Sequence, residues 1–380
     1  MQNQATVSRR GFITGTTLGV ASLGLNWPGL LTAGERGLFP EAAEVPAAPI
    51  RLNRNESPYG LAATSIQAIQ NAIISQSPRY PFEEPAKLAE ALADRNGVSK
   101  DHVLLGCGSI EILKMATETF CSATRSAVVA EPTFEAVVSY CPLAHATPVK
   151  IDLTKEYQHD LPKMLAAAKQ SGGLIFFCNP SNPAGTYIGK RETEEFVRQV
   201  PAGVTLLVDE AYFEYIDRPD YESCVRYVRE GLPIIVSRTF SKVYGMAGLR
   251  VGYAIGHPDL IKQMSHHRLA NNPNQLATTA ALAALKDETH VHRIRRRNQE
   301  VRESLFQDLH RMELKFIPSE TNFVMVDLGR PAGPVIKALE QRQVLVGRLF
   351  PSMPNHMRVT LGTPDEMKVF VREFKGVMKA

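Results

Sequence analysis

The sequence predicts an α/β protein with a large domain, built on a mostly parallel seven-stranded sheet, and a smaller α+β domain. Short apolar runs alternate with helical patterns along most of the chain, which is typical of a parallel sheet with helices on both faces. Polar residues directly follow several of these runs, where open α/β sheets bind their ligands. The expected strands are 103–105, 127–129, 149–151, 174–177, 206–208, 234–237 and 251–255.

The pattern changes after Asn272 and Pro273. We expect a long helix over residues 276–309 with a break near Asp287, then short strands at 315–317, 322–326, 344–346 and 357–360. At 380 residues, with 44% hydrophobic and 22% charged residues, the chain is long enough for two lobes. We predict a signal and linker at 1–49, an arm joining the small domain at 50–62, a large domain at 63–272 and a small domain at 273–380. The substrate is expected in the cleft between the lobes.

The N-terminus is similar to a twin-arginine export signal. Arg9 and Arg10 precede a mildly apolar stretch, residues 13–25, that is rich in Gly and Thr. This stretch is short for a membrane-spanning helix, which needs roughly 20 apolar residues. A periplasmic or exported protein is therefore expected, with only transient contact with the membrane. The alternative is an ordinary N-terminal tail on a cytoplasmic protein.

Residues 104–111 lead from an apolar run into a helical pattern through small residues, among them Gly108 and Ser109. Small residues at such a junction let backbone amides and a helix N-terminus face an anion. We expect Cys107, in the same turn, to be a small, buried and unreactive thiol. A glycine-rich turn that binds nothing is the alternative.

Two further apolar runs end in polar residues. The run 173–177 leads to two Asn-Pro pairs, and an Asn held extended before Pro, such as Asn182, can project its amide into a cleft. The run 204–208 ends at Asp209, a position from which a carboxylate can keep a pyridine nitrogen protonated, with Tyr212 close behind. A plain turn and a helix N-cap are the respective alternatives.

Lys242 follows the apolar run 233–236, where burial would disfavour its charged form and free the amine for a Schiff base with an aldehyde. The nearby hydroxyls of Thr239 and Ser241, together with Arg250, are suited to a phosphate. These residue types indicate a pyridoxal-phosphate (PLP) site. A surface lysine is the alternative.

Together, and in this order, these segments resemble the aspartate-aminotransferase superfamily of PLP-dependent enzymes, in particular its histidinol-phosphate aminotransferase branch. The resemblance extends from about Ile50 to the C-terminus and includes the motifs at 51–60, 79–81, 131–134 and 357–362. It implies the PLP-dependent transferase fold of that superfamily, and a homodimer. The chain differs from the residues most frequent in the family at two motif positions: Ile110 stands where an acidic residue is frequent, and Ala184 where threonine is. Neither departure removes a catalytic group.

The resemblance also implies a role for each matching residue. Lys242 forms the Schiff base with PLP and later moves the proton, and Asp209 pairs with the pyridine nitrogen. The ring is held by Asn182, Tyr212 and Phe134. The phosphate is bound by Gly108, Ser109, Thr239, Ser241 and Arg250, and by Tyr80 from a neighbouring subunit. Arg358 binds the substrate's α-carboxylate, for which a planar guanidinium is well shaped.

Two further substrate contacts are predicted. Tyr59 lies in a loop expected to influence specificity. Arg348 is a second candidate anion ligand, for which a solvated arginine after a strand is the alternative. The identities of donor and acceptor stay open.

Three functions are compatible with these residues. The first is an aminotransferase with ping-pong transfer of an amino group from an amino acid, or a histidinol-phosphate-like amine, to a 2-oxo acid. The second is a PLP-dependent decarboxylase or amino-acid oxidase on the same fold. The third is a non-catalytic PLP-binding protein, against which the complete catalytic set argues. Because histidine biosynthesis is cytoplasmic, an exported relative is not expected to be its housekeeping enzyme.

Composition excludes other partners. The formal net charge of +4 is partly supplied by the N-terminal signal, so it argues for no nucleic-acid partner. Five cysteines without a CxxC pair predict neither a disulfide framework nor a metal site.

Overall fold

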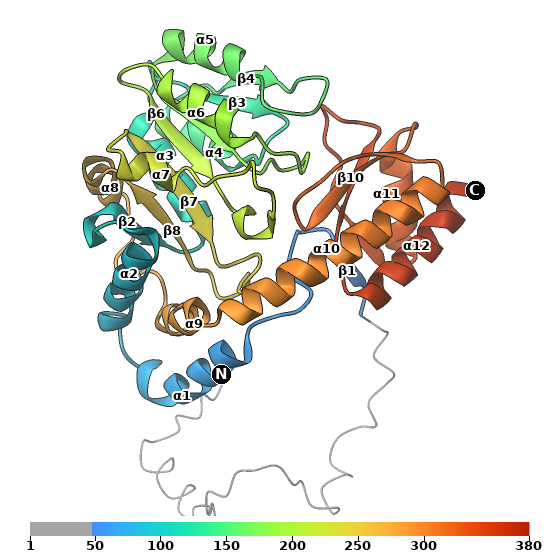
Figure 1. Cartoon of the computed structure of the whole chain (residues 1–380), viewed down its shortest axis with the longest axis horizontal. Helices are drawn as coiled ribbons and strands as arrows, with labels where there is room; N and C mark the ends of the chain where they lie inside the picture. The colour runs from blue at the N-terminus through green and yellow to red at the C-terminus, as the bar shows by residue number, and fades with distance from the viewer. Residues whose placement is uncertain (1–47, 380) are drawn as a thin grey trace, which may run out of the picture. The chain divides into compact units, whose positions relative to one another are not determined.

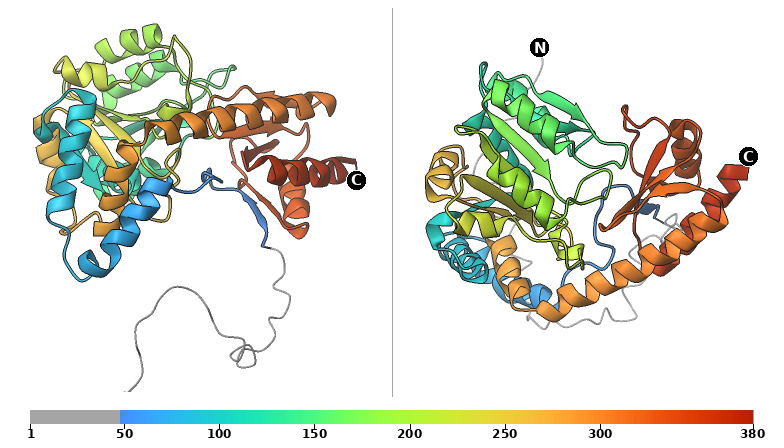
Figure 2. Two further views of the ribbon diagram at one scale, coloured as in Figure 1. Left: turned by 60° about the horizontal axis from the view of Figure 1, so that its bottom comes forward. Right: turned by 45° about the horizontal axis from the view of Figure 1, so that its top comes forward.

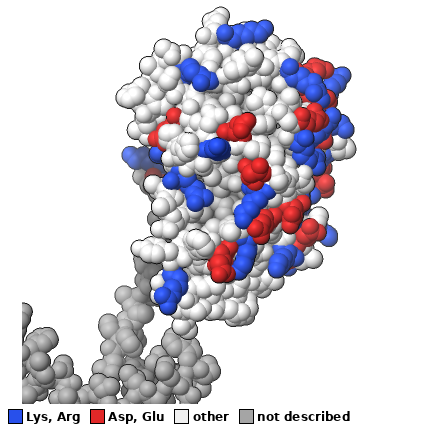
Figure 3. Space-filling model, turned by 90° about the vertical axis from the view of Figure 1, so that its left-hand side faces the viewer, with Lys and Arg blue, Asp and Glu red and all other residues white. Residues whose placement is uncertain are grey.

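The computed structural model describes residues 48–379, and the predicted export signal lies outside them. Residues from Pro49 onward form one compact unit. No helix in this described part combines the length and apolar character needed to cross a bilayer. Figure 3 shows one face of the molecule, on which basic and acidic side chains are interspersed along one flank.

The large sheet of the described chain has seven strands (Figures 1 and 2). They are β2 (Val103–Gly106), β3 (Ala127–Glu131), β4 (Val149–Asp152), β5 (Leu174–Cys178), β6 (Thr205–Asp209), β7 (Ile234–Thr239) and β8 (Gly252–Gly256). Their spatial order is β2-β8-β7-β6-β5-β3-β4. Neighbours from β4 to β7 are parallel, whereas β8 is antiparallel to both β7 and β2. The predicted mostly parallel, seven-stranded sheet is confirmed.

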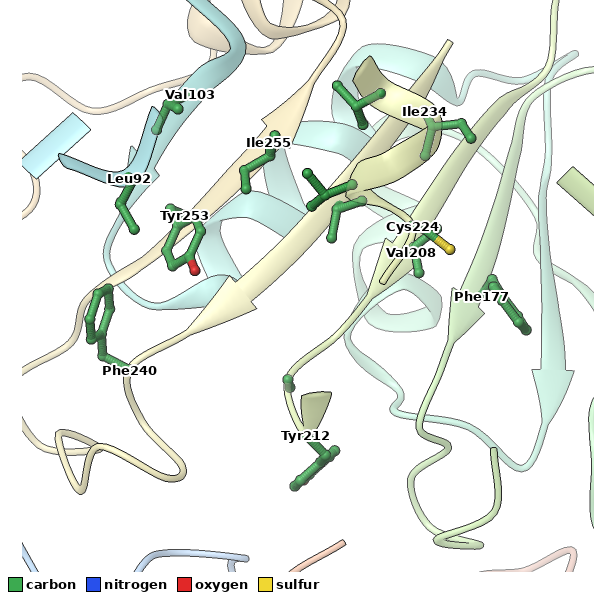
Figure 4. Packing of buried hydrophobic residues seen from close by; sticks show 14 of the residues in the cluster. Leu92, Val103, Phe177, Val208, Tyr212, Cys224, Ile234, Phe240, Tyr253 and Ile255 are labelled. Carbon is green, nitrogen blue, oxygen red and sulfur yellow. The ribbon is translucent and has the colours of Figure 1, made fainter. Parts of the chain in front are cut away.

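Helices cover both faces of this sheet because successive strand residues point to opposite sides. In β6, Leu206 and Val208 belong to one apolar cluster and Leu207 to the other. The first cluster also holds residues of α2 (Glu83–Asn96), α5 (Leu161–Ser171), α6 (Lys190–Arg198), α7 (Val225–Arg229) and α9 (Gln275–Leu285). The second holds residues of α3 (Ser109–Phe120), α4 (Ala136–Tyr140) and α8 (Pro258–Ser265). Figure 4 shows part of the first cluster.

The small lobe has its own apolar cluster. The lobe is built from β1 (Ile50–Leu52), α10 (Glu288–Arg311), β9 (Lys315–Ile317), β10 (Phe323–Asp327), α11 (Ala332–Gln341), β11 (Val344–Val346), β12 (His356–Thr360) and α12 (Pro364–Lys379). β10 lies between β9 and β12 and is antiparallel to both. β1 pairs in parallel with β11, so the start of the described chain is tied to its C-terminal part. α1 (Ala63–Gln76) instead packs on α9.

The long helical stretch between the lobes is interrupted where the sequence predicts. α9 ends at Leu285 and α10 begins at Glu288. Asp287 caps the second helix, since its Oδ1 accepts a hydrogen bond of 3.0 Å from the His290 N–H. Figure 2 shows α10 running from the large lobe to the small one.

Candidate active site

A cavity of about 1010 Å³ lies at the carboxyl ends of three neighbouring strands of the large sheet. Cys178, Asp209 and Thr239, the last residues of β5, β6 and β7, line it. The small lobe closes the opposite side through residues that include Val346 and Arg358. Because parallel strands end at the same edge, polar residues far apart in the sequence converge here.

Lys242 lies just beyond β7 and lines the cavity. Its Nζ donates hydrogen bonds to the carbonyl oxygens of Asn55, at 2.9 Å, and Arg54, at 3.3 Å. Burial, and next the positive charge of Arg358, lower the pKa of the lysine amine to about 8. The depressed pKa expected from the sequence therefore has a structural cause, and the amine is a nucleophile and base near neutral pH.

Asp209 ends β6 and is 2% exposed. Burial raises the pKa of its carboxyl group to about 7, although the Ala211 N–H donates to Oδ1 at 3.2 Å. A carboxyl group with this pKa is poised to ionise when a cationic partner enters the cavity.

Tyr212 is held by a residue from the N-terminal segment. The Asn55 amide donates to the Tyr212 hydroxyl at 3.0 Å, and the Asn55 Oδ1 accepts from the Thr360 hydroxyl at 3.0 Å. Burial raises the pKa of the Tyr212 phenol above its usual value, so the hydroxyl keeps its proton. Asn55 thus links the two lobes across the cavity.

Hydroxyls and a guanidinium gather where the chain enters α3. The Arg250 Nη1 donates to the Ser241 hydroxyl at 3.3 Å, and the Thr239 hydroxyl accepts from the Ser241 N–H at 3.1 Å. Gly108 precedes the helix with φ = 74°, and a Cβ there would collide with the Arg250 guanidinium. With Ser109 at the helix N-terminus, this cluster forms a cradle for a small anion.

Arg358 enters the cavity from β12 of the small lobe. Its Nη1 donates to the Asn182 Oδ1 at 2.7 Å and its Nη2 to the Asn53 carbonyl at 3.1 Å. Burial lowers the pKa of this guanidinium, and Nε has no hydrogen-bond partner within the described residues. A buried arginine that lines the cavity is well placed to bind a carboxylate.

Arg348 also lines the cavity, but in an ion pair. Its Nη2 lies 2.5 Å from a carboxylate oxygen of Glu135, and its guanidinium carbon lies 4.3 Å from the centre of the Phe350 ring. Sequence reasoning proposed Arg348 as an anion ligand and did not single out Glu135.

The remaining predicted residues divide by position. Phe134 lines the cavity, on the side of the large lobe. Tyr59 is not among the lining residues: it packs against the large-lobe core beneath the guanidinium of Arg297, 5.3 Å from its ring centre. Its role in substrate binding stays a prediction. Tyr80 is 81% exposed, outside the cavity of its own chain.

Sequence reasoning missed some residues at the cavity. Asn55 and Asn53 belong to the motif at 51–60, but the pattern gave them no role. The spacing of Asn55 from its partners, 157 residues to Tyr212 and 305 to Thr360, leaves no local signal. Asn179, of the first Asn-Pro pair, instead accepts from the Ile188 N–H at 2.9 Å and holds its own loop.

These residues fit PLP. The cradle at Arg250 suits its phosphate, the lysine amine suits its aldehyde, and the Asp209 carboxyl suits its pyridine nitrogen. The buried hydroxyl of Thr133, on the cavity wall, lacks a partner within the described chain, as does Arg358 Nε. Polar atoms left unpaired at a cavity wall favour a polar occupant.

Comparisons with known proteins agree with this geometry. The profile of the family Aminotransferase class I and II matches residues 48–374. A histidinol-phosphate aminotransferase of Moorella thermoacetica is 38% identical over 335 residues, which cover 87% of this chain and 85% of that protein. Histidinol-phosphate aminotransferase 2 of Pseudomonas fluorescens is 36% identical, with 88% and 90% covered.

A solved structure shows the same fold. The histidinol-phosphate aminotransferase from Sinorhizobium meliloti, in complex with pyridoxal-5'-phosphate, superposes with a TM-score of 0.82 at 24% identity. The match covers 87% of this chain and 91% of that one.

Proposed function

The chain belongs to the class I and II aminotransferase family, and from this premise we propose how its own residues carry out the reaction. It is a PLP-dependent aminotransferase, which moves an amino group from an amine donor to a 2-oxo acid. One observation carries the assignment of roles: the Lys242 amine, the Asp209 carboxyl group and the Arg358 guanidinium line one cavity, where Asp209 and Arg358 are buried and Lys242 is partly buried.

We assign PLP to the residues already described. Its phosphate would be held by Gly108, Ser109, Thr239, Ser241 and Arg250, and its ring by Asp209, Asn182, Tyr212 and Phe134. When bound, PLP supplies a protonated pyridine ring that stabilises negative charge at the donor's α-carbon. The Asp209 carboxylate would keep the pyridine nitrogen protonated, and the positive charge of that nitrogen would in turn lower the raised pKa of Asp209 and favour its ionised form.

Lys242 would serve as the base. With a pKa near 8, its Nζ can take a proton from the donor's α-carbon and deliver it elsewhere on the same substrate face. Its hydrogen bonds to the backbone carbonyls of Asn55 and Arg54 hold the amine at the cavity wall. Those carbonyls belong to the N-terminal segment, so the segment positions the base.

Arg358 would bind the donor's α-carboxylate. Asn182 accepts from Nη1 and the Asn53 carbonyl from Nη2, which fixes the plane of the guanidinium and leaves a second N–H on each of these nitrogens for the substrate. The relatives named histidinol-phosphate aminotransferases make a phosphate-bearing amine our first candidate donor for this chain. Arg348 is the candidate ligand for the distal anion of such a donor.

We also propose a homodimer. Ile74, Tyr80 and Phe82 are 88%, 81% and 87% exposed and cluster along the chain at the end of α1 and start of α2. Exposed apolar side chains of this size favour an interface, and Tyr80 would then approach the phosphate cradle of the partner. A sedimentation measurement on the wild type and Phe82→Glu tests this, with a dimer that the substitution weakens expected. A monomeric wild type would reject the proposal.

Export by the twin-arginine route is likewise our proposal, supported by Arg9 and Arg10 before an apolar stretch. Cell fractionation of the wild type and an Arg9→Lys, Arg10→Lys double variant tests it. We expect the wild type in the periplasm and the double variant in the cytoplasm. Equal cytoplasmic retention of both would contradict it.

The aminotransferase assignment is tested by the visible absorption of purified protein loaded with PLP. The protein is titrated with amino acids and histidinol phosphate, and then with a 2-oxo acid. We expect one donor class to convert the cofactor to its amine form and the 2-oxo acid to reverse the change. Release of carbon dioxide or consumption of oxygen without that reversal would indicate decarboxylation or oxidation instead.

A further inference from the structure

The ion pair between Glu135 and Arg348 lies at the cavity and joins the two lobes. Glu135 follows Phe134 in the large lobe, and Arg348 follows β11 in the small one. Their side chains are 51% and 49% exposed, so water reaches the pair. A second contact beside it, from the Ser352 hydroxyl to Glu131 at 3.1 Å, joins the same two segments.

Arg348 is held in place more firmly than Glu135. Its Nη1 donates to the Leu349 carbonyl at 3.1 Å, and its guanidinium lies over the Phe350 ring. Glu135 is the N-cap residue of α4, yet its side chain makes no capping hydrogen bond to that helix. The glutamate carboxylate can therefore leave the arginine without disrupting its own helix, whereas the arginine stays.

The two arginines of the small lobe face one aromatic ring. The guanidinium carbons of Arg348 and Arg358 lie 4.3 and 5.4 Å from the centre of the Phe350 ring, so they are less than 10 Å apart. A donor that carries an α-carboxylate and a distal anion can contact both. Burial is the main cause of the lowered pKa of Arg358; the positive charge of Arg348 lowers it further, and the negative charge of Glu135 raises it.

We propose that Glu135 is a specificity-determining residue, an internal anion that occupies Arg348 when the donor's side chain is uncharged and is displaced by a distal phosphate or carboxylate. This inference rests on the proposed function. An exposed ion pair contributes little to stability, so a bound anion can replace it. With a neutral donor, the Glu135 carboxylate keeps Arg348 paired. With a charged donor, the same carboxylate competes for Arg348 and lowers the affinity for that donor.

The test compares PLP-loaded wild type with Glu135→Gln and Arg348→Gln. One arm measures kcat/KM for histidinol phosphate, for glutamate and for a neutral amino acid. The other measures binding of succinate, which has no amino group to transfer, by calorimetry. Glu90→Gln is the matched control, because Glu90 forms a similarly exposed ion pair with Lys100 at 2.7 Å, away from the cavity.

We expect Glu135→Gln to raise the ratio of charged-donor to neutral-donor kcat/KM about three- to fivefold, and Arg348→Gln to lower it at least as much. The donor that responds, phosphate or carboxylate, identifies the distal anion. Succinate should bind more tightly to Glu135→Gln if a carboxylate is that anion.

Two results would overturn the inference. Equal changes for all donors would show that the pair only holds the lobes together, and an unchanged ratio, like that of Glu90→Gln, would show that Glu135 does not select. Failure of the proposed function is distinguishable, because the wild type would then transaminate no donor while the succinate arm still reports on Glu135.

Discussion

Replacing Glu210 by Gln is expected to lower the melting temperature of the cofactor-free protein by about 4–7 °C. Glu210 and Arg238 form an ion pair at 2.8 Å with side-chain exposures of 1% and 7%. Glu210 follows Asp209 and Arg238 precedes Thr239, so the pair ties together the ends of β6 and β7 that line the cavity.

The magnitude follows from the charge left behind. In the wild type, Glu210 accepts a hydrogen bond of 2.7 Å from the Cys224 N–H. Gln keeps the shape of Glu and can still accept this bond, but it leaves the Arg238 guanidinium buried without an opposite charge. Removing one partner of a buried ion pair costs about 3–5 kcal/mol. At about 2.1 cal/mol/K per residue, the unit from Pro49 to Ala380 has an unfolding entropy of about 0.7 kcal/mol/K, which gives the temperature shift stated.

A double-mutant cycle, measured by scanning calorimetry without PLP, separates the charge from the packing. Arg238→Met should be destabilising to a similar degree. The variant with both substitutions should lose less than the sum of the two, by about 2 kcal/mol, because neither charge is then left unpaired.

The control is Glu300→Gln, whose ion pair with Arg296 is exposed at 60% and 82% and should shift the melting temperature by less than about 1.5 °C. The reasoning is refuted if Glu210→Gln behaves like this control, or if the two losses simply add.

Three further predictions follow from the site and its surroundings. Lys242→Ala should reduce transamination below detection in single-turnover assays, because no other lysine of the described chain lines the cavity; substantial retained activity would remove the lysine from the mechanism. Arg358→Met should raise KM at least tenfold for donors with an α-carboxylate and less for amines without one, and an equal effect on both would contradict its assignment. Burial raises the pKa of Glu214 from 4.5 to about 7, so its contribution to stability is full below pH 4.5 and is lost as the pH rises through 7. Glu214→Gln should therefore flatten the fall in melting temperature between pH 4.5 and 8 in the cofactor-free protein, and an unchanged profile would show that Glu214 ionises normally.

The part of the site that sequence reasoning reached is local along the chain. The sequence predicts Asp209 from its place at the end of an apolar strand and Lys242 from its place three residues beyond one, because burial and the strand's end are both set by neighbouring residues. The break at Asp287 is equally local, since a cap needs only the next three residues.

Residues that act through distant partners were not readable in this way. Asn55 contacts Tyr212 and Thr360, and Glu135 meets Arg348 only because β11 folds back over the cavity. The Tyr59 side chain packs against the large-lobe core and Arg297, and its predicted role in substrate binding stays a prediction.

The sequence by itself determined the α/β sheet, the lysine and carboxylate at its strand ends, and the cofactor these residues suit, because each depends on the order of neighbouring residues. The tertiary structure alone decided which side chains share the cavity and in what charge state. Burial of Lys242 and Asp209 sets their pKa values, and burial depends on the small lobe closing over them. The pairing of Arg348 with Glu135 is fixed in the same way, since Coulomb interactions depend on distance in space and not on separation along the chain.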